Sequence, residues 1–116
     1  MRPAENQTGT GEPDERLLEK VVRIIVETAA PKMIILFGSA ARKTMTASSD
    51  LDLLVIMPDG VHRRKTAQMI YRSLRGLGIS KDIVVVTESD MEMYGDNPSL
   101  VIFPAMREGR EIYRVA

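Results

Sequence analysis

Three aspartates stand where they could share a metal ion. Asp50 and Asp52 are two residues apart at the start of a predicted strand, 50–57, in which all the other residues are apolar. Side chains two apart on a strand point to the same face, roughly 7 Å apart along it. Asp82 begins the next predicted strand, 82–87, and adjacent strands lie about 4.8 Å apart. In the right register, the three carboxylates therefore converge.

A divalent cation would offset the cost of placing these charges beside apolar residues. The chain has no cysteine and one histidine, and a set of carboxylate oxygens favours Mg²⁺ or Mn²⁺ over Zn²⁺. Asp82 also has a plainer interpretation, because an aspartate at a strand start can simply satisfy a turn. The pair Asp50 and Asp52 therefore carries the prediction of a metal site.

A second motif, Gly38-Ser39, follows the predicted strand 33–37 and precedes a short helix start at 40–42. Unpaired backbone N–H groups at such a junction can bind an anion. Glycine lets a phosphate approach the backbone closely, and the serine hydroxyl can donate one more hydrogen bond. Beside a carboxylate metal site, this motif predicts phosphoryl or nucleotidyl transfer, in which metal ions bridge the nucleophile, the phosphate and the leaving group.

One domain, 13–116, must position these residues, behind a flexible tail over 1–12. Apolar residues at helical spacing predict a first helix that starts with Pro13 and ends at Pro31. A second helix should bury the face shared by Ala67, Ile70, Tyr71 and Leu74, with Gly76 and Gly78 as C-terminal caps.

In the C-terminal third, Glu88, Asp90, Glu92 and Asp96 are expected to be loop and cap residues. A further helix is predicted to start near residues 96–97, to kink at Pro104 and to end at Gly109. A short edge strand over 111–115 would follow. The predicted order is helix, strand, short helix, strand, helix, strand, helix, strand.

Bulk composition limits the function. Sixteen basic residues balance sixteen acidic ones, so we expect no stable binding of nucleic acid through a broad electrostatic surface. The basic run 62–65 is interpreted as a solvated helix face. The absence of cysteine excludes disulfides and thiolate chemistry. Apolar runs are too short to cross a membrane and no signal core is visible, so we expect a soluble cytoplasmic protein.

The motifs together resemble a known family. Gly38-Ser39, ten residues, then Asp50-Leu51-Asp52 is similar to the signature of the DNA polymerase β-like nucleotidyltransferases. The apolar strands before and after it extend the match, and the segment 107–113 resembles the minimal nucleotidyltransferase (MNT) branch. That branch includes antitoxins paired with HEPN ribonuclease toxins. The resemblance covers roughly residues 33–114 and implies an α/β (α+β) fold, a small mixed β-sheet with helices mainly on one face.

In that family the first two aspartates bind two Mg²⁺ ions and the third helps to hold the catalytic ion. The resemblance places Asp50, Asp52 and Asp82 in these metal-binding and catalytic roles. It places Gly38 and Ser39 at the triphosphate of ATP, and gives Arg42 a further phosphate contact. The implied reaction moves AMP from ATP onto a tyrosine of a HEPN toxin partner, which blocks the ribonuclease.

Two other functions stay open. Ala40 and Lys43 depart from the residues that many relatives carry after the serine, which motivates an antitoxin that neutralises its partner by binding alone. Transfer to a small molecule such as an aminoglycoside is the other, although such enzymes usually carry a further domain for the acceptor. Template-directed polymerisation is disfavoured, because the chain has neither the length nor the basic surface to hold a duplex.

Overall fold

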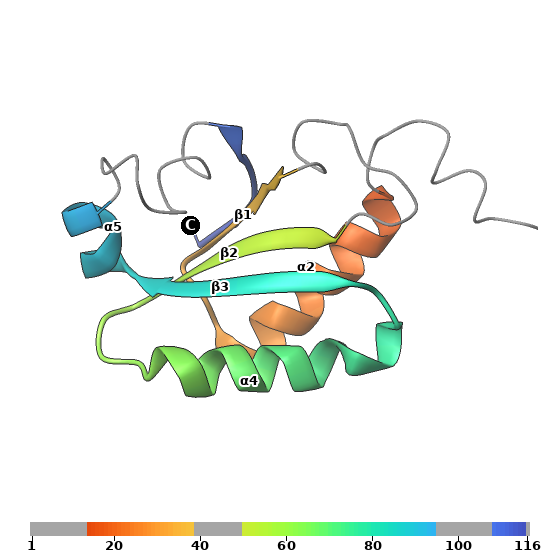
Figure 1. Ribbon diagram of the computed structural model, residues 1–116, viewed down its shortest axis with the longest axis horizontal. Helices are drawn as coiled ribbons and strands as arrows, with labels where there is room; N and C mark the ends of the chain where they lie inside the picture. Colours follow the sequence, from red (N-terminus) through yellow and green to blue (C-terminus); the bar gives the residue numbers. More distant parts are fainter. Residues whose placement is uncertain (1–13, 39–49, 95–107, 116) are drawn as a thin grey trace, which may run out of the picture.

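The computed structural model describes residues 14–38, 50–94 and 108–115. In this part of the chain, a four-stranded sheet with the order β3-β2-β1-β4 is flanked by helices (Figure 1). Its elements are α2 (Glu15–Ala29), β1 (Met33–Phe37), β2 (Leu51–Met57), α4 (Arg63–Leu74), the 3₁₀ turn η1 (Arg75–Leu77), β3 (Lys81–Thr87), α5 (Glu88–Tyr94) and β4 (Arg110–Arg114).

The sheet is mixed, as the sequence predicts. β1 pairs antiparallel with both β2 and β4, whereas β2 and β3 run parallel through the crossover that contains α4. The register aligns Phe37 with Asp52 and Asp52 with Asp82. A backbone hydrogen bond of 2.9 Å from Leu51 N to Ser80 O ties the starts of β2 and β3 together. The amino ends of these two strands therefore lie side by side.

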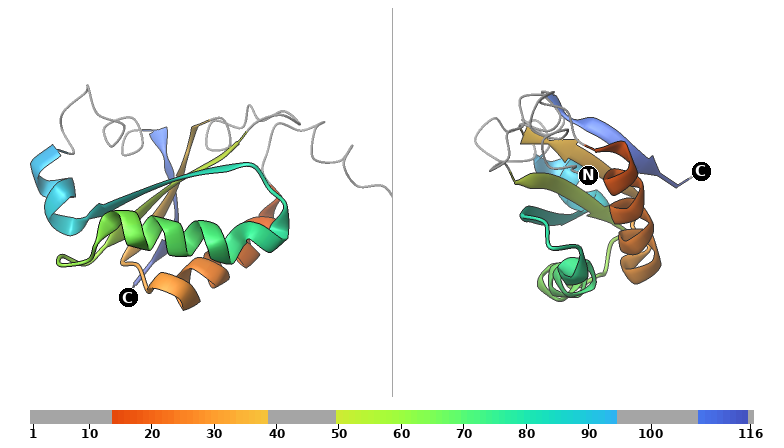
Figure 2. Two further views of the ribbon diagram at one scale, coloured as in Figure 1. Left: turned by 60° about the horizontal axis from the view of Figure 1, so that its bottom comes forward. Right: turned by 90° about the vertical axis from the view of Figure 1, so that its right-hand side faces the viewer.

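Helices α2 and α4 cover one face of the sheet and pack against each other (Figure 2). Alternate residues of the strands point to these helices and form the larger core, which includes Ile34, Leu36, Leu53, Val55 and Ile83. The other alternating set forms a smaller cluster on the opposite face, with Ile35, Leu54, Ile56 and Val86 buried there. The aspartates Asp52 and Asp82 belong to this second face, because their neighbours Leu53 and Ile83 point to the helices.

Helix α2 begins at Glu15, two residues later than its sequence suggests. Asp14 is the N-cap, and its carboxylate accepts hydrogen bonds from the backbone N–H groups of Arg16 and Leu17 at 2.9 and 3.4 Å. An aspartate outside the helix satisfies these otherwise unpaired donors, which explains why Asp14 caps the helix and does not belong to its first turn. The helix ends as predicted before Pro31, with Ala30 in the left-handed region at φ 51°.

The buried face of α4 consists of Thr66, Ile70 and Leu74, which recur at four-residue spacing. Tyr71, which the sequence placed on this face, is 36% exposed at the margin of the helix. His62 caps α4, and its Nδ1 atom accepts a hydrogen bond of 3.2 Å from Lys65 N. The basic run at 62–65 is exposed, as expected for a solvated helix face.

Helix α5 contradicts the prediction that Glu88 and Glu92 lie in a loop, whereas Asp90 is a capping residue, one of the two roles predicted for it. Its first turn is held by a reciprocal pair of hydrogen bonds: Thr87 N donates to Asp90 Oδ2 at 3.0 Å and Asp90 N donates to Thr87 Oγ1 at 3.2 Å. This is the geometry of a capping box. The sequence Thr87-Glu88-Ser89-Asp90 carries the signal for it, because a hydroxyl residue followed three positions later by an acid begins many helices.

Strand β4 runs from Arg110 to Arg114 and forms one edge of the sheet, within one residue of the predicted edge strand. Gly78 takes φ 64° after η1, as expected for a C-terminal cap. None of the described helices is long and apolar enough to span a membrane. The predicted tail, the short helix at 40–42 and the predicted helix from 96–97 up to residue 107 lie outside the described residues.

Candidate active site

The predicted metal-binding carboxylates lie at one end of the sheet. Asp52 is half-buried in β2, and Asp50 stands exposed just before that strand. Asp82 is exposed in β3, directly across from Asp52 in the parallel register. The register that the sequence required is therefore present, and it places Asp52 and Asp82 on the same face at neighbouring positions.

Gly38 packs directly against the carboxylate of Asp52. The glycine follows β1 and adopts a left-handed conformation with φ 72°. A Cβ atom built on Gly38 would collide with Oδ2 of Asp52 and would lie 3.0 Å from its Cγ. Both the backbone conformation and this close approach require a residue without a side chain. The glycine of the predicted phosphate motif and the second aspartate of the predicted metal motif thus form one contact.

Asp82 is engaged at the other side, on the outer edge of β3. The hydroxyl of Tyr71, from α4, donates a long hydrogen bond of 3.4 Å to Asp82 Oδ1. The same hydroxyl accepts a hydrogen bond of 2.8 Å from the backbone N–H of Ile83. Asp52 therefore contacts Gly38 at the end of β1, whereas Asp82 contacts Tyr71 of helix α4 beside the edge strand β3.

The three predicted metal-binding acids do not form a compact set in the part of the chain that the structure describes. Within residues 14–38, 50–94 and 108–115, no group of three histidine, cysteine or acidic side chains is close enough to hold a metal ion. Ser39 and Arg42, the other predicted phosphate ligands, lie outside the described residues. Tyr71 is a contact of the site that sequence reasoning missed, because only the packing of α4 on β3 brings it to Asp82.

The residues present nevertheless fit a divalent cation with a nucleotide. Asp50, Asp52 and Asp82 offer carboxylate oxygens, which Mg²⁺ and Mn²⁺ prefer, and two of them are aligned across adjacent strands. The absence of a side chain at Gly38 lets the Asp52 carboxylate lie against the backbone at the end of β1. Magnesium typically uses a few protein carboxylates together with water and phosphate oxygens. Two exposed acids and a half-buried acid that lies against a glycine match this pattern.

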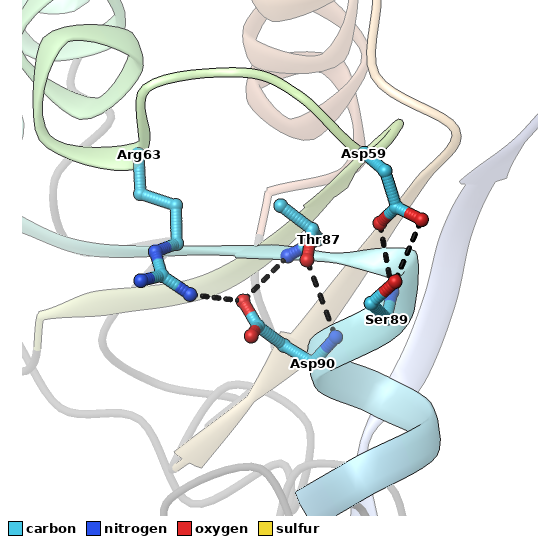
Figure 3. A network of polar contacts seen from close by, with 5 residues as sticks. All are labelled: Asp59, Arg63, Thr87, Ser89 and Asp90. Carbon is cyan, nitrogen blue, oxygen red and sulfur yellow. Dashed lines mark hydrogen bonds and ion pairs between the residues drawn. The ribbon is translucent and has the colours of Figure 1, made fainter.

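A second polar cluster lies at the opposite end of β3, where α5 begins (Figure 3). Asp59 accepts hydrogen bonds from Ser89 N and Ser89 Oγ at 2.9 and 2.6 Å. Arg63 donates to Asp90 at 2.6 Å. Hydrogen bonds from Ser89 lower the pKa of Asp59, and the Arg63 guanidinium, followed by the Thr87 N–H, lowers the pKa of Asp90. These contacts join α5 to the β2–α4 connection and to the first turn of α4, so we interpret the cluster as structural.

The fold and these residues define a known class. A family model for the nucleotidyltransferase domain matches residues 18–111, and the chain belongs to this family. Its fold is similar to that of a candidate nucleotidyltransferase from Sulfolobus solfataricus, with a TM-score of 0.59 and 18% identity over 85% of this chain and 78% of that chain. No curated protein shows significant sequence similarity to the chain.

Two toxin–antitoxin structures share the fold as well. The MntA–HpeT structure matches with a TM-score of 0.57 and 17% identity over 89% of this chain and 74% of that chain. A toxin–antitoxin structure with AMP-PNP matches with a TM-score of 0.55 and 20% identity over 84% of this chain and 73% of that chain. The predicted nucleotidyltransferase fold is confirmed.

Proposed function

We propose that this protein transfers a nucleoside monophosphate, AMP from ATP, to a hydroxyl group of a partner protein. The observation that carries the proposal is the contact between Gly38 and Asp52 in a chain that belongs to the nucleotidyltransferase family. The two motifs that the reaction needs, one for phosphate and one for metal, meet at this contact. The alignment of Asp82 with Asp52 across β2 and β3 supports the same assignment.

In the proposed reaction, the acceptor oxygen forms a bond to the α-phosphorus of ATP as the bond to the β-phosphate breaks. Pyrophosphate leaves, and the hydroxyl proton passes to a carboxylate or to water. Asp50, Asp52 and Asp82 would hold Mg²⁺, which would neutralise phosphate charge when bound. Gly38 would leave room for the triphosphate next to the backbone, and Ser39 and Arg42 are proposed to contact its oxygens.

The proposed partner is a toxin of the HEPN class, and the proposed outcome is neutralisation of that toxin by AMP addition. The motifs at 38–52 and 107–113 resemble the MNT antitoxins, and two structures with a similar fold come from toxin–antitoxin pairs. A zero net charge also favours a protein acceptor over a long nucleic acid. We propose that the protein acts in the cytoplasm, where ATP and Mg²⁺ are abundant.

The contact between Asp82 and Tyr71 favours one alternative, an antitoxin that acts by binding alone. In this arrangement the third carboxylate faces the edge of β3. A binding-only antitoxin would not need the three acids to converge. Only the catalytic function requires the carboxylate of Asp52, so the variant Asp52→Asn can separate the two functions.

The deciding experiment uses α-labelled ATP, Mg²⁺ and host extract, with the wild-type chain beside Asp52→Asn. We expect a labelled protein with the wild type and none with the variant, because the amide binds Mg²⁺ more weakly than a carboxylate. Glu92→Gln is the matched control, since it removes an exposed carboxyl on α5 at the other end of β3.

Equal labelling by the wild type and Asp52→Asn would contradict the assigned site. If neither protein labels a partner, but Asp52→Asn still protects cells from the toxin as well as the wild type does, the binding-only function replaces the catalytic one. Circular dichroism of Asp52→Asn checks that the fold is intact in each case.

A further inference from the structure

Tyr71 makes two hydrogen bonds of very different quality at the edge of the sheet. It accepts from Ile83 N at 2.8 Å, a normal length, whereas its own proton is directed to Asp82 Oδ1 at 3.4 Å. Hydroxyl donors usually bond at about 2.7–2.8 Å, so the second contact is weak. The tyrosine is thus held mainly by the strand backbone, and it holds the carboxylate only loosely.

The ring of Tyr71 is fixed independently of Asp82. It belongs to α4, and its hydroxyl reaches the backbone of the edge strand β3, which pairs with β2 on its inner side. The Lys81 ammonium lies 5.9 Å from the centroid of the ring, within the range of a cation–π contact, and also donates to Ile79 O at 3.2 Å. Movement of the Asp82 carboxylate would therefore leave the tyrosine in place.

Asp82 has a second position within reach. Its backbone is aligned with that of Asp52, about 4.8 Å away across the parallel pair. A rotation about the Cα–Cβ bond of Asp82 can redirect its carboxylate from the edge towards Asp52. The exposed position of Asp82 leaves room for such a change, and the loss is one long hydrogen bond.

We propose that Tyr71 is a positioning residue that keeps the Asp82 carboxylate at the outer edge of β3 until a divalent cation binds beside Asp52. The inference rests on the proposed function and adds a step to it. Before binding, the two carboxylates stay apart, which limits the repulsion between like charges on one face. When the cation binds, Asp82 leaves the hydroxyl and turns inward, while Tyr71 stays bonded to Ile83.

The test measures metal affinity without turnover. Mn²⁺ is titrated by isothermal calorimetry into protein saturated with α,β-methylene ATP, which cannot release pyrophosphate. Tyr71→Phe removes the competing hydrogen bond, so we expect Mn²⁺ to bind about two- to fivefold more tightly than to the wild type. Tyr113→Phe, on the opposite edge strand β4, is the matched control and should leave the affinity unchanged.

A double-mutant cycle identifies the route of the effect. If Tyr71 acts through Asp82, then Tyr71→Phe changes nothing in an Asp82→Asn background. Loss of the hydrogen bond from Ile83 N lowers the unfolding midpoint of Tyr71→Phe in either case. A purely structural role would be shown by a change in Mn²⁺ affinity that persists in the Asp82→Asn background. Unchanged or weaker Mn²⁺ binding by folded Tyr71→Phe, or an effect independent of Asp82, would overturn the proposal.

A second measurement needs no tyrosine variant. The ¹³C resonance of the Asp82 carboxyl, assigned by its loss in Asp82→Asn, should shift as Mg²⁺ is added with the same nucleotide analogue. The amide of Ile83 should keep its shift, because Tyr71 stays in place. A carboxyl resonance that does not move would overturn the proposal.

If Asp52→Asn binds Mn²⁺ as well as the wild type does, the proposed function itself fails, so the two failures are distinguishable.

Discussion

At the scale of single residues, Gly38 meets two separate demands. Its φ of 72° disfavours any side chain, and a Cβ there would overlap the Asp52 carboxylate. Gly78 meets only the first demand, since its φ is 64° and nothing lies within 4 Å of a Cβ built on it. Alanine variants at these two glycines therefore distinguish the effect of backbone strain from the effect of displacing the Asp52 carboxylate.

We expect Gly38→Ala and Gly78→Ala each to lower the free energy of unfolding by about 1–2 kcal/mol, the cost of a left-handed alanine. Only Gly38→Ala should also weaken Mn²⁺ binding and abolish nucleotidyl transfer, because its methyl group displaces Asp52. Urea unfolding measures the first effect, and calorimetry with labelled ATP assays measures the second. Normal metal binding by Gly38→Ala would show that Asp52 does not need its present position.

At the scale of elements, α5 depends on its first turn. Thr87 and Asp90 satisfy each other's backbone N–H groups, and Asp59 holds Ser89 from the β2–α4 connection. The helix has only seven residues, a length that is unstable by itself in water. Its presence therefore follows from the capping box and from contacts with β3, not from helical propensity.

The lowered pKa values of Asp59 and Asp90 predict how this turn responds to acid. Both folded pKa values lie below the ordinary value of 3.8, so the unfolded chain binds protons more readily. The stabilisation is complete above that ordinary value and is lost as the pH falls through the lowered folded values.

Asp90→Asn is expected to lower the free energy of unfolding by about 1 kcal/mol at neutral pH, the usual contribution of a helix cap. Its difference from the wild type should be constant above the ordinary pKa of 3.8 and should shrink as the pH falls below that value, because the wild-type carboxyl then becomes protonated. Urea unfolding across this range is the measurement, with exposed Glu92 as the control in Glu92→Gln. A difference that stays constant with pH would contradict the role of the charged carboxylate.

At the scale of the whole molecule, the candidate site and the structural polar cluster lie at opposite ends of the sheet. The candidate site lies at the amino ends of β2 and β3, and the α5 cluster lies at their carboxyl ends. Helices α2 and α4 fill the face opposite the aspartates (Figure 1). The carboxylates can therefore change partners without disturbing the core formed by residues such as Leu36, Leu53 and Val55.

Ligand binding should be visible as stability of the whole domain. Mg²⁺ with α,β-methylene ATP is expected to stabilise the wild type, by about 2.7 kcal/mol when ligand exceeds its dissociation constant a hundredfold. The double variant Asp50→Asn/Asp52→Asn should fold but gain no such stabilisation. Thermal unfolding with and without ligand tests this, and an equal gain in both proteins would place the nucleotide elsewhere.

The sequence alone determined the strands and the pairing of chemical groups within each motif. β1 matches its predicted bounds at 33–37, and β2 and β3 differ from theirs by one residue. Short apolar runs bounded by turns are decided locally. Asp50 lies just before β2, so the shared face of Asp50 and Asp52 stays a prediction. The start of helix α5 is also encoded locally, by Thr87 and Asp90, but this capping box was not recognised from the sequence.

Only the tertiary structure decided which distant residues meet. The parallel crossover through α4 aligns Asp82 with Asp52. The antiparallel pairing of β1 with β2 places Gly38 against the Asp52 carboxylate. Tyr71 has the spacing of a core residue, yet the packing of α4 at the edge of β3 carries its hydroxyl to Ile83 and Asp82. Periodicity specifies the face of a helix, but the hydrogen-bond partner of a side chain depends on where that helix docks.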